Sequence, residues 1–290
     1  MEVQLASEAS PDAAVNEDFA VAVPGFVAVL DGVTAPPGLD TGCVHNPAWY
    51  VRRLGTHLVA NHSANETASP PELLAAAISA VRDDHGATCD LDHPGTPQST
   101  VCLLRAGPEH ADYLVLCDSP LVLDHDGRVE VITDRRHEQT SRQLREAAVA
   151  GGYAFGSDDR ASRLRQLVTS QREHVNRPGG YWIAAANAAA AHHAVTGRLP
   201  LTGPARLRRA ALLTDGASCA VEAFALMDWT QLLDVLAERG PAHLISLVRQ
   251  AERSDAVGQR QPRHKRHDDA TAAYCRFGGP PRTRVSPRTG

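Results

Sequence analysis

The sequence predicts an α+β protein with largely antiparallel sheets. Short runs of β-branched and aliphatic residues, bounded by Asp, Gly or Pro, are typical of β-strands, and amphipathic helical patterns lie between them. The two kinds of segment come in mixed blocks rather than in strict alternation, which favours α+β over parallel α/β architecture. Of the 290 residues, 43% are hydrophobic, which is sufficient for a full hydrophobic core.

Eight segments have the composition of β-strands. They are Phe19–Val23, Phe26–Leu30, Thr100–Leu104, Tyr113–Cys117, Pro120–Leu123, Arg128–Thr133, Ala210–Thr214 and Ala270–Phe277. The dipeptide Asp126-Gly127 separates two of these runs, and Asp-Gly between such runs is a strong hairpin signal. We therefore predict a hairpin from Leu121 to Ile132.

The clearest helical pattern is Glu72–Val81, whose apolar residues fall on one face and which follows a capping Ser69 and two prolines. Trp229–Glu238 repeats the pattern and stops at Gly240-Pro241, and a further helix is expected from Leu244 to Ala251. Helices are also expected in four other segments: Pro47–Ala60, Glu138–Ala150, Arg160–His174 and the alanine-rich Ile183–Val195.

Two polar segments predict irregular structure. Asp255–His267 is basic and without periodicity, so a loop is expected there. Gly278–Gly290 is rich in Pro, Gly and Arg and poor in apolar residues, which is typical of disorder. The sequence thus predicts one domain over residues 1–277 and a disordered tail over 278–290.

Composition argues against several classes of function. The formal net charge of −5 is unlike that of a nucleic-acid-binding domain, which usually has a basic surplus. No apolar run approaches the ~20 residues needed to span a membrane, and the N-terminus lacks the pattern of a signal peptide. The six cysteines are scattered without a CxxC pair, which favours reduced thiols. A cytoplasmic protein without nucleic-acid or membrane partners is expected.

Three aspartates adjoin predicted strands in a recurring way. Asp31 and Asp215 end two of the strands, each followed by glycine, and Asp268 lies just before a third. A carboxylate at the tip of a strand is held in a fixed position by the sheet. Mg²⁺ and Mn²⁺ prefer such oxygen ligands and retain several waters, so a few carboxylates suffice for two ions.

A plain turn is the alternative interpretation of each Asp-Gly pair. Asp-Gly after a strand is usually a turn, and Asp126-Gly127 in this chain is interpreted as one. The joint order of the acidic motifs carries more weight than any single pair.

The motifs that form this order are Asn16-Glu17-Asp18, FVAVLDG ending at Gly32, Ser99-Thr100 followed by YLVLCDSPLVL, LLTDGA around Asp215, and DDAT from Asp268. Their sequence resembles that of the protein phosphatase 2C (PPM) family of metal-dependent Ser/Thr phosphatases, as a divergent bacterial-type member. The resemblance covers about residues 10 to 277.

The resemblance implies an αββα sandwich of two antiparallel sheets flanked by helices, and a centre for two Mn²⁺ or Mg²⁺ ions. Asp31, Asp215 and Asp268 would be the catalytic metal ligands, and Gly32 would offer its carbonyl. By the same resemblance, Glu17 or Asp18 would hold a metal-bound water and Asp118 an accessory third ion. Two such ions lower the pKa of a bridging water toward neutrality, and the resulting hydroxide attacks phosphorus.

One departure concerns substrate binding. The family usually has an arginine four residues before the acidic motif, where this sequence has Ala13. A charge-assisted contact of that kind is worth ~1.5–3 kcal/mol. Either another arginine substitutes, with Arg52 and Arg53 on the following predicted helix as the candidates, or substrate binding is weak. In addition, Val33 stands where many relatives have a histidine that is a candidate general acid.

The expected function is hydrolysis of phosphoserine or phosphothreonine in a phosphorylated protein substrate. Two alternatives stay open from sequence alone. A pseudophosphatase would keep the fold and bind a phosphoprotein or metal without turnover. A phosphatase for a small phosphorylated metabolite is the other alternative.

Overall fold

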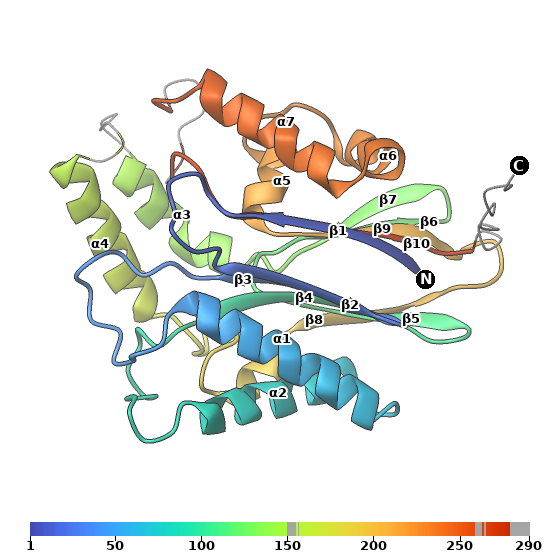
Figure 1. Cartoon of the computed structure of the whole chain (residues 1–290), viewed down its shortest axis with the longest axis horizontal. Helices are drawn as coiled ribbons and strands as arrows, with labels where there is room; N and C mark the ends of the chain where they lie inside the picture. Colours follow the sequence, from blue (N-terminus) through green and yellow to red (C-terminus); the bar gives the residue numbers. More distant parts are fainter. Residues whose placement is uncertain (150–154, 156, 259–262, 264, 279–290) are drawn as a thin grey trace, which may run out of the picture.

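The chain folds into two antiparallel sheets packed face to face, with helices on both outer sides (Figure 1). The computed structural model describes residues 1–149, 155, 157–258, 263 and 265–278. Within these residues each sheet has five strands, and every pair of neighbouring strands is antiparallel. The predicted αββα sandwich is thereby confirmed.

The first sheet has the strand order β2-β3-β4-β5-β8. Its strands are β2 (Asp18–Val23), β3 (Phe26–Gly32), β4 (Ser99–Ala106), β5 (His110–Leu116) and β8 (Val195–Pro200). The second sheet has the order β1-β10-β9-β6-β7. Its strands are β1 (Glu2–Glu8), β10 (Ala270–Arg276), β9 (Leu207–Leu213), β6 (Leu121–His125) and β7 (Arg128–Ile132).

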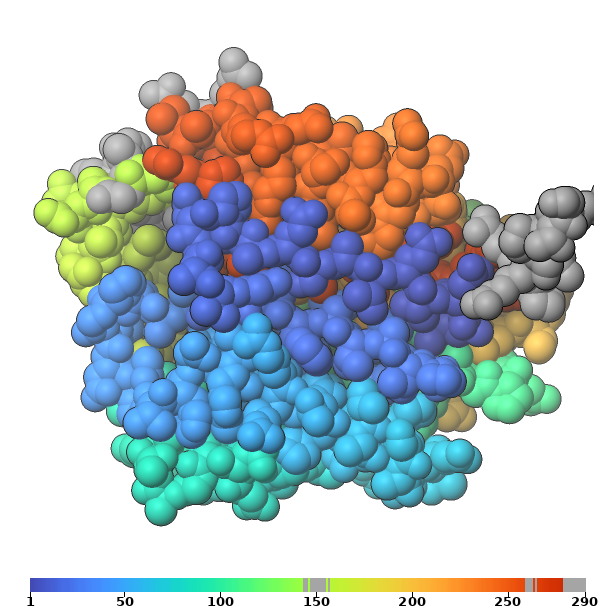
Figure 2. Space-filling model, viewed as in Figure 1, coloured from blue at the N-terminus to red at the C-terminus, as the bar shows by residue number. Residues whose placement is uncertain are grey.

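Helices form the outer layers of the sandwich (Figure 1). The first sheet is covered by α1 (Pro47–Ala64) and α2 (Pro70–Asp84). The second is covered by α5 (Asp215–Glu222), α6 (Trp229–Arg239) and α7 (Pro241–Ser254). The pair α3 (Arg136–Val149) and α4 (Asp158–Arg172) packs together at one end of the sandwich. Figure 2 shows the N-terminal segment, in dark blue, lying along the seam between the two halves.

The central strands are buried on both faces, which explains their continuous apolar sequences. In β3, Val27 and Val29 pack between the sheets, and Phe26, Ala28 and Leu30 pack toward α1 and α2. All five side chains are fully buried. Burying a large aliphatic or aromatic side chain contributes roughly 1.5–3 kcal/mol, so this strand is a rigid support for the residues at its end.

Several expected elements are confirmed. The hairpin is formed by β6 and β7, and Asp126 and Gly127 have φ angles of 49° and 69°, as a type I′ turn requires. Ser69 begins α2 in a capping box with Glu72. The expected helices at 229–238 and 244–251 correspond to α6 and α7. No helix among the described residues is long and apolar enough to cross a membrane.

The helix predicted over Ile183–Val195 is wrong. Only a short 3₁₀ helix, η1 (Ala188–His193), forms there, and Val195 begins β8. Alanine favours helix intrinsically, but Ala184 instead exchanges backbone hydrogen bonds with Ser99 of β4. This tertiary pairing extends the sheet at the expense of local propensity.

Two strands, β1 and β8, were not predicted. Both lie at sheet edges, where one side of the strand has no strand partner. Edge strands carry polar residues, Gly and Pro, which removes the apolar signal that identifies a buried strand. Ala150, the expected end of one helix, lies outside the described residues, as do residues 279–290 of the predicted tail.

Candidate active site

Acidic residues come together at one end of the first sheet, where β2 begins and β3 ends. Asp18 begins β2 and lies directly opposite Asp31, near the end of β3, in the antiparallel register. On its other side Asp31 faces Thr100 of β4. In an antiparallel pair one strand begins where its neighbour ends, so acidic residues that are distant in sequence meet at the same end of the sheet.

The second sheet contributes Asp215, just after β9, and Asp268, just before β10. Asp215 is the first residue of α5, one residue beyond Thr214, which follows β9, and Asp268 lies two residues before β10. The backbone between them is closely packed, since a Cβ added at Gly216 would lie 1.9 Å from the carbonyl oxygen of Asp269. Only glycine permits this approach of α5 to the start of β10.

A buried hydrogen bond joins the acidic strand ends of the two sheets. The Thr214 hydroxyl donates to Asp18 Oδ2 at 2.8 Å and accepts the backbone N–H of Thr271 at 3.0 Å. Asp18 is only 4% exposed. The bond therefore fixes a carboxylate of the first sheet against the strand ends of the second.

The carboxylates perturb one another, so they form one electrostatic cluster. Burial raises the pKa of Asp18 well above its usual range, and the charges of Asp215 and Asp268 raise it further. Burial is also the largest cause of the raised pKa of Asp31, followed by the charges of Asp215, Asp18 and Asp268. Burial raises the pKa of Asp268 to about 7. Such crowding of negative charge favours a bound cation.

One ammonium group lies among these carboxylates. Lys265 Nζ donates to Asp268 Oδ1 at 2.7 Å and to the Thr34 hydroxyl at 3.2 Å. Burial would lower the pKa of Lys265, but the charges of Asp268, Asp215 and Asp31 raise it overall. The lysine is therefore charged and partly neutralises the cluster.

Glu17 and Asp269 organise the N-terminal side of the site. Asp269 accepts the backbone N–H groups of Ser10 (2.7 Å) and Glu17 (2.6 Å) on its two different carboxylate oxygens. The Glu17 side chain accepts a 2.6 Å hydrogen bond from Thr34. Burial raises the pKa of Glu17, and Thr34 and Lys265 oppose this. Asp269, which the sequence analysis left without a role, holds the acidic motif in place.

Gly32 fits closely under the same motif. Its N–H donates to the Glu17 carbonyl at 3.0 Å, and an added Cβ would lie 2.5 Å from that oxygen. The backbone of β3 can approach Glu17 only because residue 32 has no side chain.

Asp118 lies in the loop between β5 and β6, beside α3. Its Oδ2 is 2.6 Å from His137 Nδ1, and ligand atoms of Cys117, Asp118 and His137 all lie within 4.8 Å of one another. Glu222 of α5 connects this region with the main cluster, because burial raises its pKa and the charges of Asp215 and Asp118 add to the effect. Asp118 therefore has a histidine as its immediate neighbour.

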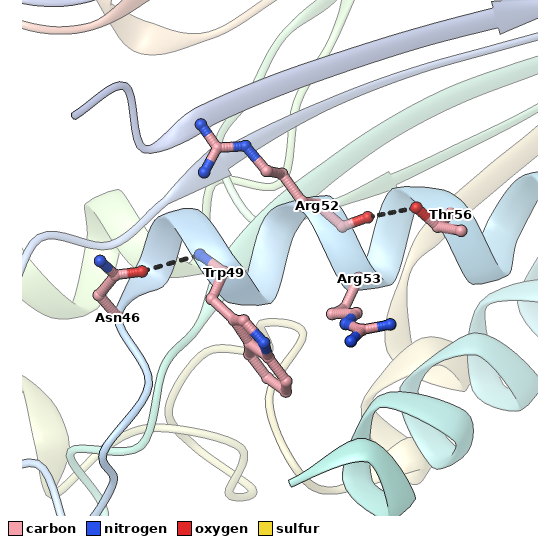
Figure 3. A pocket seen from close by; sticks show the side chains of 5 residues that line it. All are labelled: Asn46, Trp49, Arg52, Arg53 and Thr56. Atoms are coloured by element: carbon pink, nitrogen blue, oxygen red, sulfur yellow. Dashed lines mark hydrogen bonds between the residues drawn. The ribbon is translucent and has the colours of Figure 1, made fainter.

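The predicted substrate-binding arginines lie on α1 (Figure 3). Arg52 and Arg53 are exposed and, together with Asn46, Trp49 and Thr56, line a surface pocket. Figure 3 shows their guanidinium groups on opposite sides of the helix. Arg53 Nε lies 3.8 Å from Asp84 Oδ2 of α2. Among the described residues, neither arginine forms a hydrogen bond or ion pair with the clustered aspartates.

The donor set fits hard divalent cations. The cluster offers carboxylate oxygens, which are the ligand type that Mg²⁺ and Mn²⁺ prefer. Its carboxylates outnumber the nearby ammonium group, so negative charge remains for an ion to neutralise. Structural zinc sites are instead built mainly from thiolates and imidazoles.

Solved structures share this fold at low sequence identity. The Ser/Thr phosphatase Stp1 from Staphylococcus aureus is 12% identical, with a TM-score of 0.58 and coverage of 96% of each chain. The PPM Ser-Thr phosphatase MsPP from Mycobacterium smegmatis, in complex with cacodylate, is 17% identical, with a TM-score of 0.53, covering 96% of this chain and 99% of its own. The catalytic domain of the phosphatase PstP with two manganese ions is 15% identical, with a TM-score of 0.53, covering 94% and 96%.

No protein-family model matches the sequence, and no curated protein matches it significantly. The identities to the solved structures are all low, so the likeness is one of fold. The chain has the fold of the PPM Ser/Thr phosphatases over nearly its whole length.

Sequence reasoning missed Lys265 although a signal was present. Lys265 is the only lysine among the 29 Lys and Arg residues of the chain, and it lies three residues before Asp268. The segment was interpreted only as a polar loop. Part of it, residues 259–262 and 264, lies outside the described residues. Thr214 was likewise read as the end of a strand rather than as the partner of Asp18.

We expect Gly216→Ala to destabilise the protein and weaken divalent-ion binding. The added Cβ would collide with the Asp269 carbonyl, and overpacking of this kind costs about 1–3 kcal/mol or more. Gly107→Ala is the matched control, because its Cβ would lie 3.5 Å from the nearest atom. Urea unfolding measures both, and a Gly216→Ala chain as stable as the control would refute the close packing.

We also expect the stability of the metal-free chain to fall as pH rises from about 4 to about 7. Asp268 has its pKa raised from the ordinary 3.8 to about 7, mainly by burial, so over this range the folded state binds more protons than the unfolded state. Asp268→Asn should flatten the dependence, and excess Mn²⁺ should stabilise more at high pH. Thermal unfolding across this range measures the effect. A pH dependence identical in Asp268→Asn would contradict it.

Proposed function

We propose that this protein is a PPM-type phosphatase that hydrolyses phosphoserine and phosphothreonine in cytoplasmic proteins. The observation that carries the proposal is the cluster of Asp18, Asp31, Asp215 and Asp268, built from the strand ends of both sheets. The fold shared with solved Ser/Thr phosphatases supports the same assignment.

In this proposal Asp31, Asp215 and Asp268 hold two Mn²⁺ or Mg²⁺ ions, with the Gly32 carbonyl as a further ligand. When bound, such a pair of ions supplies a water that is ionised near neutral pH and positive charge for the phosphate oxygens. Glu17 and Asp18 orient water from positions fixed by Thr34 and Thr214. Asp118, beside His137, is the candidate ligand of a third ion.

We assign the missing phosphate-binding role to Lys265. Its ammonium group already lies among the aspartates, whereas Ala13 offers no charge. A substrate phosphate beside the ions would replace Asp268 or Thr34 as a partner of the ammonium. Arg52 and Arg53 remain the other candidates, and the same assay can distinguish the three residues.

A pseudophosphatase is the second candidate, and the position of Lys265 favours it. Because the ammonium compensates part of the cluster's charge without any ion, the site is less dependent on metal than one composed of carboxylates alone. A small-metabolite phosphatase receives less support, because α3 and α4 add a helical layer at one end of the sandwich and His137 of α3 contacts Asp118. Such a layer provides surface for a protein substrate.

We expect Asp31→Ala and Asp268→Ala to abolish Mn²⁺-dependent hydrolysis of p-nitrophenyl phosphate and of a phosphoserine peptide. Each change removes a proposed ligand of the ions that activate water. Asp112→Ala, which removes a carboxylate paired with Arg198 and Arg105, is a control outside the cluster. Calorimetry with Mn²⁺ accompanies the assay. Two bound ions without any hydrolysis would favour the pseudophosphatase, and no binding at millimolar Mn²⁺ would exclude both.

We expect Lys265→Met to raise KM for the peptide about tenfold or more and to tighten Mn²⁺ binding. The first effect follows from losing a charge-assisted contact and the second from losing a competing cation. Lys265→Arg should preserve most of the affinity, and Arg52→Ala and Arg53→Ala show whether either arginine contributes. Tighter Mn²⁺ binding with unchanged KM would mean that Lys265 is only a counter-ion.

A further inference from the structure

A second group of metal-ligand side chains lies in the connections that flank α1 and α2. Cys43 and His45 belong to the segment between β3 and α1, and Cys89 follows α2. The two sulfur atoms are 3.1 Å apart, and His45 Nδ1 lies 3.6 Å from the sulfur of Cys43 and 3.5 Å from that of Cys89. None of these residues takes part in the carboxylate cluster.

The two segments are held together by their backbones. The Asp90 N–H donates to the Gly42 carbonyl at 2.7 Å. Gly42 has a φ of +65°, and an added Cβ would lie 2.4 Å from His93 Cβ, so only glycine fits. The approach of Cys43 to Cys89 is therefore fixed by the main chain and does not depend on the thiols alone.

Aromatic packing fixes the imidazole of His45. Its ring stacks on Trp49 with centroids 3.9 Å apart, and the ring of His85 meets it edge-on at 5.2 Å. This packing leaves Nδ1 directed at both sulfur atoms.

His85 adds an independent observation. It is 4% exposed, and its Nδ1 lies 2.7 Å from the Val81 carbonyl, so that nitrogen carries the proton. Its Nε2 is then a lone-pair acceptor, and in the described part of the chain it has no hydrogen-bond partner. Burial of an unpartnered acceptor is costly. His85 therefore places a buried ring with an unpartnered nitrogen beside His45.

The distances agree with a tetrahedral ion of zinc size in two of three cases. Bond lengths of about 2.3 Å to sulfur and about 2.0–2.1 Å to nitrogen place neighbouring S and N ligands roughly 3.6 Å apart and two sulfurs roughly 3.8 Å apart. The S···N distances match, and the sulfurs are closer than this. The separation of 3.1 Å between the sulfurs is also well beyond the bond length of about 2.05 Å in a disulfide.

The acid–base chemistry of the thiols is compatible with ion binding. Burial opposes ionisation of Cys89, but hydrogen bonds from Cys43, the Val44 backbone, Thr88 and His45 lower its pKa to about 7. Burial and the neighbouring Cys89 raise the pKa of Cys43 to about 11. An ion that binds both sulfurs would displace the protons that the thiols still hold.

We propose that Cys43, His45 and Cys89 bind a soft divalent ion of the zinc class. The ion would hold the segment between β3 and α1, which contains Thr34, close to the C-terminal end of α2. Arg172 of α4 donates to the Asp40 carbonyl in this segment at 2.9 Å. The segment is therefore also connected to the helix pair α3 and α4. The role is structural and independent of the phosphatase assignment.

Cobalt is a spectroscopic probe for such a site. The full chain carrying Asp31→Ala, Asp118→Ala and Asp268→Ala, which removes proposed ligands of both carboxylate sites, is reduced and titrated with Co²⁺. We expect one equivalent to bind with a thiolate-to-cobalt charge-transfer band in the near ultraviolet and the visible bands of tetrahedral Co²⁺. Zn²⁺ should displace it stoichiometrically.

Cys43→Ser and Cys89→Ser should each weaken the charge-transfer band and lower Co²⁺ affinity by at least about tenfold. Cys219→Ser is the matched control, because it is the one other cysteine that is not fully buried. A spectrum unchanged in Cys43→Ser would overturn the proposal. So would a Cys43–Cys89 disulfide in the isolated chain combined with no cobalt binding after reduction.

Discussion

Repulsion among the clustered carboxylates is the constraint around which this structure is organised. Asp18, Asp31 and Asp268 share a small region with Asp215, and the pKa values of the first three are raised by burial and by their neighbours' charges. Such a cluster destabilises the fold unless strong interactions elsewhere hold its members in place. The apolar central strands supply that support. β3 is buried on both faces, so the position of Asp31 is fixed by core packing rather than by the site itself.

The structure relieves this repulsion in two ways that differ in strength. Thr214 hydrogen-bonds Asp18 between the sheets, and this neutral contact holds the carboxylate without cancelling its charge. Lys265 supplies a positive charge from the polar segment between α7 and β10. The remaining negative charge is what a divalent ion would neutralise. Cation binding and fold stability are therefore linked, because an ion that binds only the folded state stabilises it.

Much of the fold could be predicted because its signals are local. The apolar runs of β3 and β4, the Asp-Gly hairpin turn and the capped helix α2 each carry their own pattern. β1 and β8 could not be found in this way, since their strand conformation comes from pairing with β10 and β5 at the sheet edges. For the same reason the helix predicted over the alanine-rich segment was wrong, because the backbone of Ala184 pairs with Ser99 instead of forming helical hydrogen bonds.

The site shows the same division between local and non-local information. The aspartates could be proposed because each adjoins a recognisable strand, whereas their partners could not. Lys265 reaches the cluster through a loop without periodicity, and the role of Asp269 depends on Ser10 and Glu17, more than 250 residues away in sequence. The cysteines show it most clearly. Cys43 and Cys89 have no CxxC spacing, and only the pairing of two loops through Gly42 and Asp90 brings them together. Scattered cysteines in a sequence therefore do not argue against a shared site when the segments that carry them flank the same pair of helices.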